Sequence, residues 1–154
     1  MEKYNLDKFL NGEINQINYV SNSLDDTINF SYEFAKYLKK TDVIVLDGEL
    51  GSGKTVFMHG IAKFFGLEDE VSSPTFTIVN EYTAKNINLY HFDVYRIDDE
   101  YQFIDTIGTE YFENGICIIE WGNIIKNILP KNTIYIEIVK IDDTSRNILI
   151  RRNI

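Results

Sequence analysis

The sequence has little that would stabilise an extracellular protein or anchor a membrane protein. Its 154 residues include a single cysteine, Cys117, so no disulfide can form within the chain. Cys117 lies in the apolar run 116–119, which favours a buried structural thiol over a nucleophile. No apolar run approaches the length of a membrane span, and residues 1–10 lack the apolar core of a signal peptide. We therefore expect a cytoplasmic protein without membrane association.

Positive charge is also scarce. The chain has 15 Lys and Arg residues against 24 Asp and Glu, which gives a formal net charge of −9. Binding a nucleic-acid backbone requires clustered basic side chains, and the one small cluster here is Arg146 with Arg151 and Arg152. An isolated chain of this composition is not expected to bind a nucleic acid, and any role near RNA would depend on another subunit.

The composition is that of a globular domain. A hydrophobic fraction of 44% and a charged fraction of 25% are ordinary for such a domain, and the length suits a single one. Residues 1–20 have weak periodicity, and we interpret them as an N-terminal extension or an extra helical turn. Residues 21–154 would then form the domain, starting with a helix that Ser23 can cap.

Residues 48–55 read GELGSGKT and form the most informative motif in the chain. Two glycines flank a four-residue loop before Lys54 and Thr55, which is the spacing of a phosphate-binding P-loop. Glycines let consecutive backbone N–H groups face an anion without interference from a Cβ atom. Lys54 would reach the β- and γ-phosphates, and the Thr55 hydroxyl would bind Mg²⁺. An accidental match is the alternative, but the apolar run 43–47 before the loop and the helical spacing in 55–65 favour a P-loop.

The remaining pattern predicts an α/β protein. β-rich segments occur at 76–82, 87–95, 115–120, 133–139 and 147–151, with a mostly helical segment at 98–114. We expect a single-domain P-loop NTPase-like fold whose mixed, mainly parallel sheet carries antiparallel strands at its margin. Ligands bind such sheets at the carboxyl ends of the parallel strands.

Two carboxylates stand at or near the carboxyl ends of predicted strands. Glu120 follows four apolar residues, the form of a strand that delivers an acid to Mg²⁺. Asp93 shares one strand face with His91 and Tyr95, where it could orient or deprotonate a water molecule. The alternatives are a surface acid for Glu120 and a solvated edge strand for Asp93. His91 alone would more often be a structural hydrogen-bonding residue, and Trp121 either a packing residue or a shield for the site.

Taken together, the segments GELGSGKT, SSPTFTIVNEY, YHFDVYRI and IIEWGNIIKNILP resemble the bacterial TsaE family in order and spacing. That family is the small ATPase of the machinery that makes threonylcarbamoyladenosine in tRNA. The resemblance covers roughly Ser21 to Arg151. Its YHFDVYRI and EW segments are more distinctive than the P-loop.

The resemblance implies a set of site residues. Asp93 and Lys54 would act in ATP hydrolysis, and Thr55 and Glu120 would hold Mg²⁺. Residues 73–75, Ser73-Pro74-Thr75, would form a switch-like loop near the γ-phosphate. The residues implied to bind ATP are Glu49, Leu50, Gly51, Ser52, Gly53, Lys54 and Thr55 at the phosphates, with Leu24 and Ser145 near the adenine.

The resemblance also implies partners. A pair of proteins resembling TsaB and TsaD would transfer the threonylcarbamoyl group, while ATP hydrolysis by this chain would support repeated turnover. tRNA would then be contacted only indirectly, through the complex. We expect the TsaD-like partner to order the loop at residues 73–75.

Three other functions remain open on sequence grounds. A P-loop small-molecule kinase usually needs an arginine-rich lid, and Arg96 is the only arginine before Arg146. A GTP-dependent switch would need an Asn-Lys-x-Asp segment, which does not occur, and the DxxG match at 105–108 lies in a predicted helix. A nucleotide-bound scaffold that does not hydrolyse ATP is the third.

Overall fold

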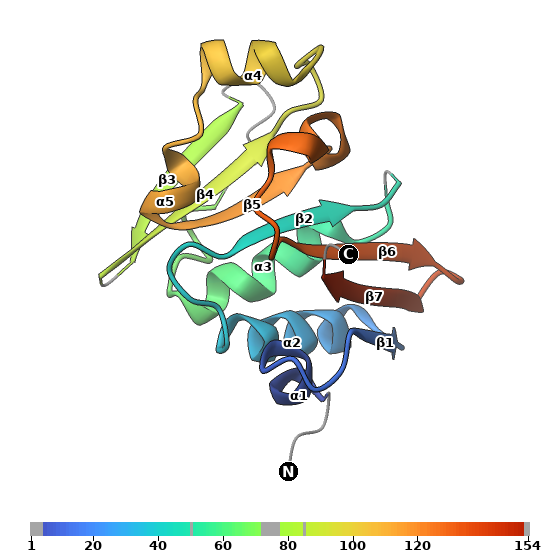
Figure 1. Cartoon of the computed structure of the whole chain (residues 1–154). Coiled ribbons are helices and arrows are strands. Elements are labelled where there is room, and N and C mark those ends of the chain that lie inside the picture. The colour runs from blue at the N-terminus through green and yellow to red at the C-terminus, as the bar shows by residue number, and fades with distance from the viewer. Residues whose placement is uncertain (1–4, 50, 72–77, 85, 153–154) are drawn as a thin grey trace.

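The computed structural model describes residues 5–49, 51–71, 78–84 and 86–152 (Figure 1). These residues form one seven-stranded sheet with the strand order β1-β7-β6-β2-β5-β4-β3. The strands are β1 (Gln16–Ser21), β2 (Val43–Asp47), β3 (Val79–Ala84), β4 (Ile87–Asp93), β5 (Ile116–Glu120), β6 (Ile134–Lys140) and β7 (Arg146–Arg152). The helices are α1 (Leu6–Leu10), α2 (Leu24–Ala35), α3 (Lys54–Phe64), α4 (Glu100–Thr106), α5 (Tyr111–Asn114) and the 3₁₀ helix η1 (Gly122–Ile128).

The sheet is mixed, with its parallel strands at the centre. β6, β2, β5 and β4 pair in parallel, whereas β3 at one margin and β7 and β1 at the other pair antiparallel. This arrangement confirms the predicted α/β fold with marginal antiparallel strands. The parallel centre also brings the carboxyl ends of β2, β4 and β5 to one edge, where Glu120 stands opposite both Leu46 and Asp93 in the strand register. The two acids that the sequence singled out are therefore neighbours.

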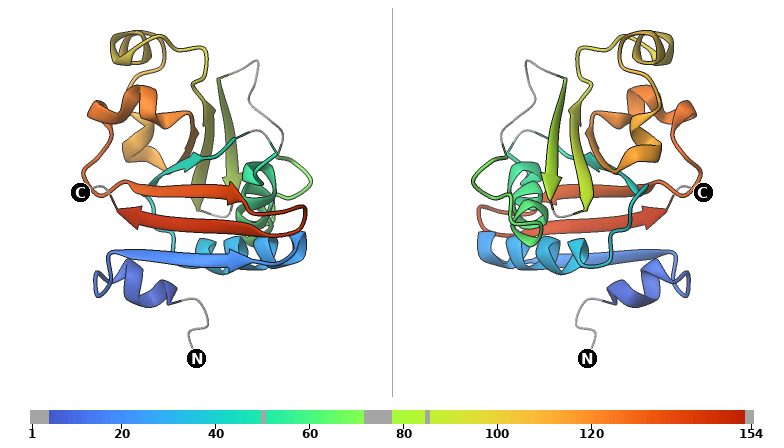
Figure 2. Two further views of the ribbon diagram at one scale, coloured as in Figure 1. Left: turned by 90° about the vertical axis from the view of Figure 1, so that its right-hand side faces the viewer. Right: turned by 90° about the vertical axis from the view of Figure 1, so that its left-hand side faces the viewer.

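Helices cover both faces of the sheet. α2 and α3 pack on one face, and α4, α5 and η1 lie on the other (Figure 1). Successive residues of β2 consequently serve two apolar clusters: Ile44 faces the α2–α3 side and Val45 faces the α4–η1 side. This double burial explains why the central strands read as continuous apolar runs. In both views of Figure 2, α1 and α4 lie at opposite ends of the molecule.

Local sequence signals explain several element boundaries. α2 begins after Ser23, whose hydroxyl accepts a hydrogen bond from the Asp26 amide at 3.0 Å, as the capping prediction required.

The interior is closely packed at two further positions. α3 packs closely on α2 at Gly60, where a Cβ atom would collide with the Ser31 hydroxyl. Cys117 is fully buried in β5, and burial raises the pKa of its thiol to about 12, in agreement with a structural role.

Residues near the beginning of the sequence are part of the sheet. The helical turn α1 buries Leu6 and Phe9 against the α2–α3 side, and β1 pairs with β7 along its whole length. The boundary that we placed at residue 20 therefore runs through β1. Across the described ranges, no helix is both long enough and apolar enough to cross a lipid bilayer.

Candidate functional site

The phosphate-binding motif forms the predicted strand–loop–helix unit. β2 ends at Asp47, and α3 begins at Lys54 directly after the loop. Gly53 caps α3 with a φ of 115°, a left-handed conformation that favours glycine. A Cβ atom on Gly48 would come within 2.8 Å of the Ile138 carbonyl oxygen, so this position also requires glycine. The local backbone therefore favours glycine at both positions, which agrees with the P-loop prediction.

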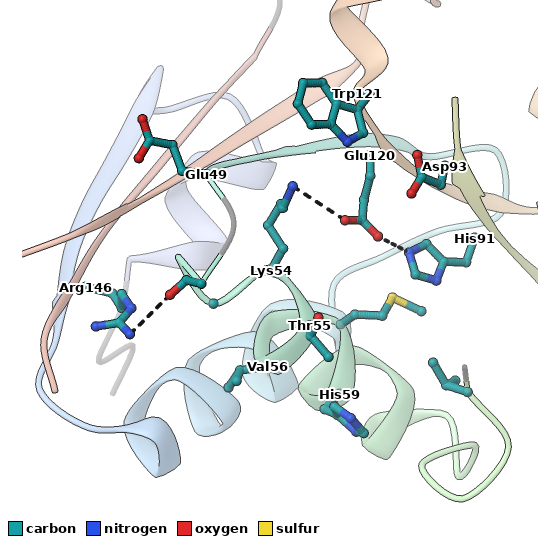
Figure 3. Close-up of a pocket in the computed structure, with 14 residues that line it drawn as sticks. Glu49, Lys54, Thr55, Val56, His59, His91, Asp93, Glu120, Trp121 and Arg146 are labelled. Atoms are coloured by element: carbon teal, nitrogen blue, oxygen red, sulfur yellow. Dashed lines mark hydrogen bonds and ion pairs between the residues drawn. The ribbon is translucent and has the colours of Figure 1, made fainter. Parts of the chain in front are cut away.

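A cavity of about 470 Å³ opens at this edge of the sheet (Figure 3). Its size falls within the range of small-molecule sites. It collects most of the residues that the sequence assigned to phosphate, metal and hydrolysis, and it adds several that the sequence did not. The predicted residues that line it are Glu49, Gly51, Gly53, Lys54, Thr55, Asp93 and Glu120, and the additional ones include His59, His91, Trp121 and Arg146.

Glu120 is the centre of a small polar network in this cavity. The Lys54 ammonium lies 3.7 Å from one carboxylate oxygen, and His91 Nε2 donates to the other at 2.8 Å (Figure 3). Burial opposes ionisation of Glu120, but the hydrogen bond and charge of His91, together with the Lys54 ammonium, hold its pKa below the ordinary value. The carboxylate therefore stays ionised at neutral pH, as a metal ligand must be.

His91 is a site residue that the sequence suggested but did not assign. Its side chain is 4% exposed, and its Nδ1 atom has no hydrogen-bond partner among the described residues. The hydrogen bond to Glu120 fixes one carboxylate oxygen and leaves the other to Lys54. The signal was the period-two pattern of the strand at 87–95, which puts His91 on the same face as Asp93. Recognising its partner required the parallel pairing of β4 with β5.

Asp93 lines the cavity at the end of β4, beside Glu120 in the register. One of its carboxylate oxygens accepts a hydrogen bond from the Tyr95 amide at 3.0 Å, which ends the strand. The position agrees with a role near the phosphates, but Asp93 is not part of the ion pair of Lys54 and Glu120.

Trp121 stands at the mouth of the cavity. It has a left-handed backbone with a φ of 66° and is 45% exposed. Its ring lies against Tyr95 in a tilted arrangement, with the ring centres 4.8 Å apart. The Lys54 ammonium lies 5.3 Å from the centre of the indole ring, within reach of a cation–π interaction. Trp121 is therefore not a core packing residue, and it covers Lys54 on its outer side.

Arg146 was missed as a site residue, because the sequence suggested only a minor basic cluster. Its Nε donates to the Ser52 carbonyl at 2.7 Å and its Nη2 to the Gly51 carbonyl at 3.4 Å. Its Nη1 donates to the carbonyls of Asp142 and Ser145 at 2.8 and 3.0 Å. The side chain thus joins the phosphate loop to the turn between β6 and β7 across 94 residues of sequence. No local pattern could have indicated this contact.

The two residues assigned to the adenine lie on the same side of the phosphate loop. Leu24, 59% exposed, lines a second cavity of about 210 Å³ together with Thr144 and Arg146. Ser145 belongs to the adjoining turn, where its amide donates to the Asp142 carboxylate. The structure therefore places Leu24 and the turn of Ser145 around one hollow next to Gly53.

Three further assignments complete the comparison with the sequence. Ser52 is buried, its amide donates to the Glu49 carbonyl, and its hydroxyl has no partner among the described residues. Leu50 and the switch-like loop at residues 73–75 lie outside the described residues.

The side chains present fit a magnesium ion that is shared with a nucleotide. The described residues contain no cluster of three His, Cys, Asp or Glu side chains that could form a protein cage for a metal. Mg²⁺ in nucleotide sites usually takes only one or two protein oxygens, and phosphates and water supply the rest. The Thr55 hydroxyl and the ionised Glu120 carboxylate, both lining the same cavity, are a donor set of this kind.

Comparison with known proteins gives a consistent result. A family model described as "Threonylcarbamoyl adenosine biosynthesis protein TsaE" matches residues 21–148. The tRNA threonylcarbamoyladenosine biosynthesis protein TsaE of Bacillus subtilis is 42% identical over 115 residues, which are 74% of this chain and 72% of that protein. Its counterpart from Treponema pallidum is 36% identical over 132 residues, which are 85% of this chain and 97% of that protein. The crystal structure of Bacillus subtilis YdiB superposes with a TM-score of 0.72 at 32% identity, covering 90% of this chain and 86% of that one.

Proposed function

Because the chain belongs to the TsaE family of threonylcarbamoyladenosine biosynthesis proteins, we propose that it binds and hydrolyses ATP in support of that modification of tRNA. In this proposal a TsaB–TsaD-like pair of proteins transfers the threonylcarbamoyl group to the tRNA adenosine in the cytoplasm. The observation that carries the proposal is the convergence of the phosphate loop, Lys54 and an ionised Glu120 in one cavity.

Each side chain of the cavity has a role in this proposal. The backbone N–H groups of the loop and the Lys54 ammonium bind the phosphates, and Lys54 exchanges its contact with Glu120 for one with phosphate. Thr55 and Glu120 hold Mg²⁺, which when bound neutralises charge that develops on the transferred phosphoryl group. His91 orients Glu120, and Asp93 orients the attacking water.

The proposal is tested by measuring the release of inorganic phosphate from ATP by the purified chain with Mg²⁺ and without any phosphoryl acceptor. Release from ATP is the expected result, and GTP serves as the matched control for base selectivity. Phosphate transfer that depends on an added small-molecule acceptor would instead indicate a kinase. Tight ATP binding without any phosphate release, with or without partners, would indicate a non-hydrolysing scaffold.

Separate replacements of the two acids should have different effects. Glu120→Ala removes a metal ligand, so the Mg²⁺ concentration needed for half-maximal activity should rise about tenfold or more. Asp93→Ala should leave nucleotide bound and lower the hydrolysis rate by about 10²-fold or more, because water is no longer oriented. The measurements are phosphate release over a range of Mg²⁺ concentrations and equilibrium nucleotide binding.

The control for both replacements is Glu113→Ala, which removes an exposed acid from the remote helix α5. It should leave both measurements at the wild-type values. An unchanged Mg²⁺ dependence in a folded Glu120→Ala protein would show that Glu120 is not a metal ligand.

A further inference from the structure

The contacts of Arg146 connect two loops that are expected to bind different parts of a nucleotide. One loop is the phosphate loop, whose Gly51 and Ser52 carbonyls accept from its guanidinium. The other is the β6–β7 turn, residues 141–145, which borders the hollow beside Leu24. Arg146 lines both this hollow and the larger cavity. A single side chain thus lies between the two cavities and donates hydrogen bonds to both loops.

The bonds of Arg146 orient the Ser52–Gly53 peptide of the phosphate loop. The structure has no cis peptide bond among the described residues, so each carbonyl points opposite to the N–H group of the next residue. Holding the Ser52 carbonyl therefore turns the Gly53 N–H away from Arg146. Gly53 is one of the loop residues whose N–H groups are expected to face phosphate. Because four of the five N–H donors of its guanidinium bond to carbonyl oxygens, any effect of Arg146 on phosphate would act mainly through this peptide.

The turn held by Arg146 has a defined shape of its own. The Asp142 carboxylate accepts from the amides of Thr144 and Ser145 at 2.9 and 2.8 Å, and the Ile141 amide donates to the Ser145 carbonyl at 3.0 Å. Arg146 Nη1 donates to the carbonyls of two residues of this turn, Asp142 and Ser145. The strand register holds Arg146 in place, since it pairs with Lys140 on one side and Ser21 on the other. The guanidinium therefore contacts the turn and the phosphate loop from one fixed position.

We infer that Arg146 is a positioning residue that couples the β6–β7 turn to the phosphate loop, so that the conformation of the turn sets the affinity of the loop for phosphate. The inference builds on the proposed function, because it requires that the loop bind a nucleotide triphosphate. It adds a route by which contact with the turn, from the base of the nucleotide, strengthens binding at the phosphates.

A double-mutant cycle with inorganic triphosphate tests the coupling. Triphosphate has no base and cannot contact the base-side hollow as ATP would, so the turn can affect its binding only through the loop. Asp142→Ala opens the turn, and Arg146→Gln removes the connection. Each single replacement should weaken triphosphate binding about tenfold, as expected when a charged hydrogen-bonding group is lost. The double variant should bind as weakly as Arg146→Gln alone, because the turn no longer communicates with the loop.

Matched variants separate coupling from charge. Asp142→Asn removes the negative charge but keeps a side-chain oxygen acceptor, so it should leave triphosphate affinity unchanged or slightly higher. Arg151→Gln removes a positive charge from an exposed residue of the same strand, about 16 Å further along at the usual rise of a strand, and should have no effect. Arg146→Lys keeps the charge but cannot span both pairs of carbonyls, and should resemble Arg146→Gln. Thermal unfolding of each variant establishes that the proteins compared are folded.

The outcomes are distinct. Wild-type affinity for triphosphate in Asp142→Ala, or losses in the two single variants that multiply in the double variant, would overturn the coupling while leaving the proposed function intact. A wild-type protein that binds neither ATP nor triphosphate would overturn the proposed function, and the coupling with it. Triphosphate binding at the wild-type level in Arg146→Lys would also overturn the coupling, because a point charge at this position would then be sufficient.

Discussion

Replacement of Lys54 by alanine should reduce Mg²⁺–ATP affinity by about 10²-fold or more while the protein stays folded, since a charged hydrogen bond contributes about 3 kcal/mol. The Lys54 ammonium contacts the Glu120 carboxylate and the Trp121 ring at the cavity, and these contacts do not form the hydrophobic core. Glu120 keeps its hydrogen bond to His91 after the replacement. The loss should therefore appear in equilibrium nucleotide binding, with little change in the thermal unfolding midpoint.

The matched control is Lys63→Ala, an exposed lysine in the last turn of α3, about 13 Å from Lys54 along the helix. It removes the same charge from the same helix and should bind Mg²⁺–ATP like the wild-type protein. Near-normal ATP affinity in a folded Lys54→Ala protein would contradict the assignment of residues 48–55 as a phosphate-binding loop.

The second large effect should come from partner proteins. Hydrolysis by the isolated chain should be slow, because Arg146 is the arginine that lines the cavity among the described residues, and four of its five N–H donors bond to backbone carbonyls instead of the γ-phosphate. Other P-loop proteins gain about 10³- to 10⁵-fold in rate when a missing cation or an ordered switch segment is supplied. We expect an increase of this order in phosphate release when TsaB-like and TsaD-like proteins are added together.

Binding of tRNA provides the complementary measurement. With a net charge of −9, the isolated chain should not bind labelled tRNA appreciably at physiological salt, whereas the assembled complex should. Each partner added alone serves as the control for non-specific stimulation. Full hydrolysis rates without partners, or tight tRNA binding by the isolated chain, would contradict the proposed division of labour.

The sequence predicted those parts of the structure that local patterns specify. The P-loop, the cap at Ser23 and the strand that ends at Glu120 each depend on residues within one segment, and each was found where it was expected. The contact between His91 and Glu120 depends on which strands are neighbours, and a single sequence does not reveal that order. The role of Arg146 is even harder to predict from the sequence, because its bonds join segments 94 residues apart. They also use backbone carbonyls, which every sequence possesses.

The pairing of β1 with β7 has a consequence for how the protein is made. β1 lies at the edge of the sheet with β7 as its neighbour, and Arg152 in β7 also donates to the Leu10 carbonyl, 142 residues earlier. A nascent chain on the ribosome therefore holds β1 without its partner strand until β7 emerges, and closing so long a loop is slow. β7 also carries Arg146, so the same late segment completes both the sheet edge and the support of the phosphate loop. Full affinity for a nucleotide should thus appear only after β7 has emerged and paired with β1 and β6.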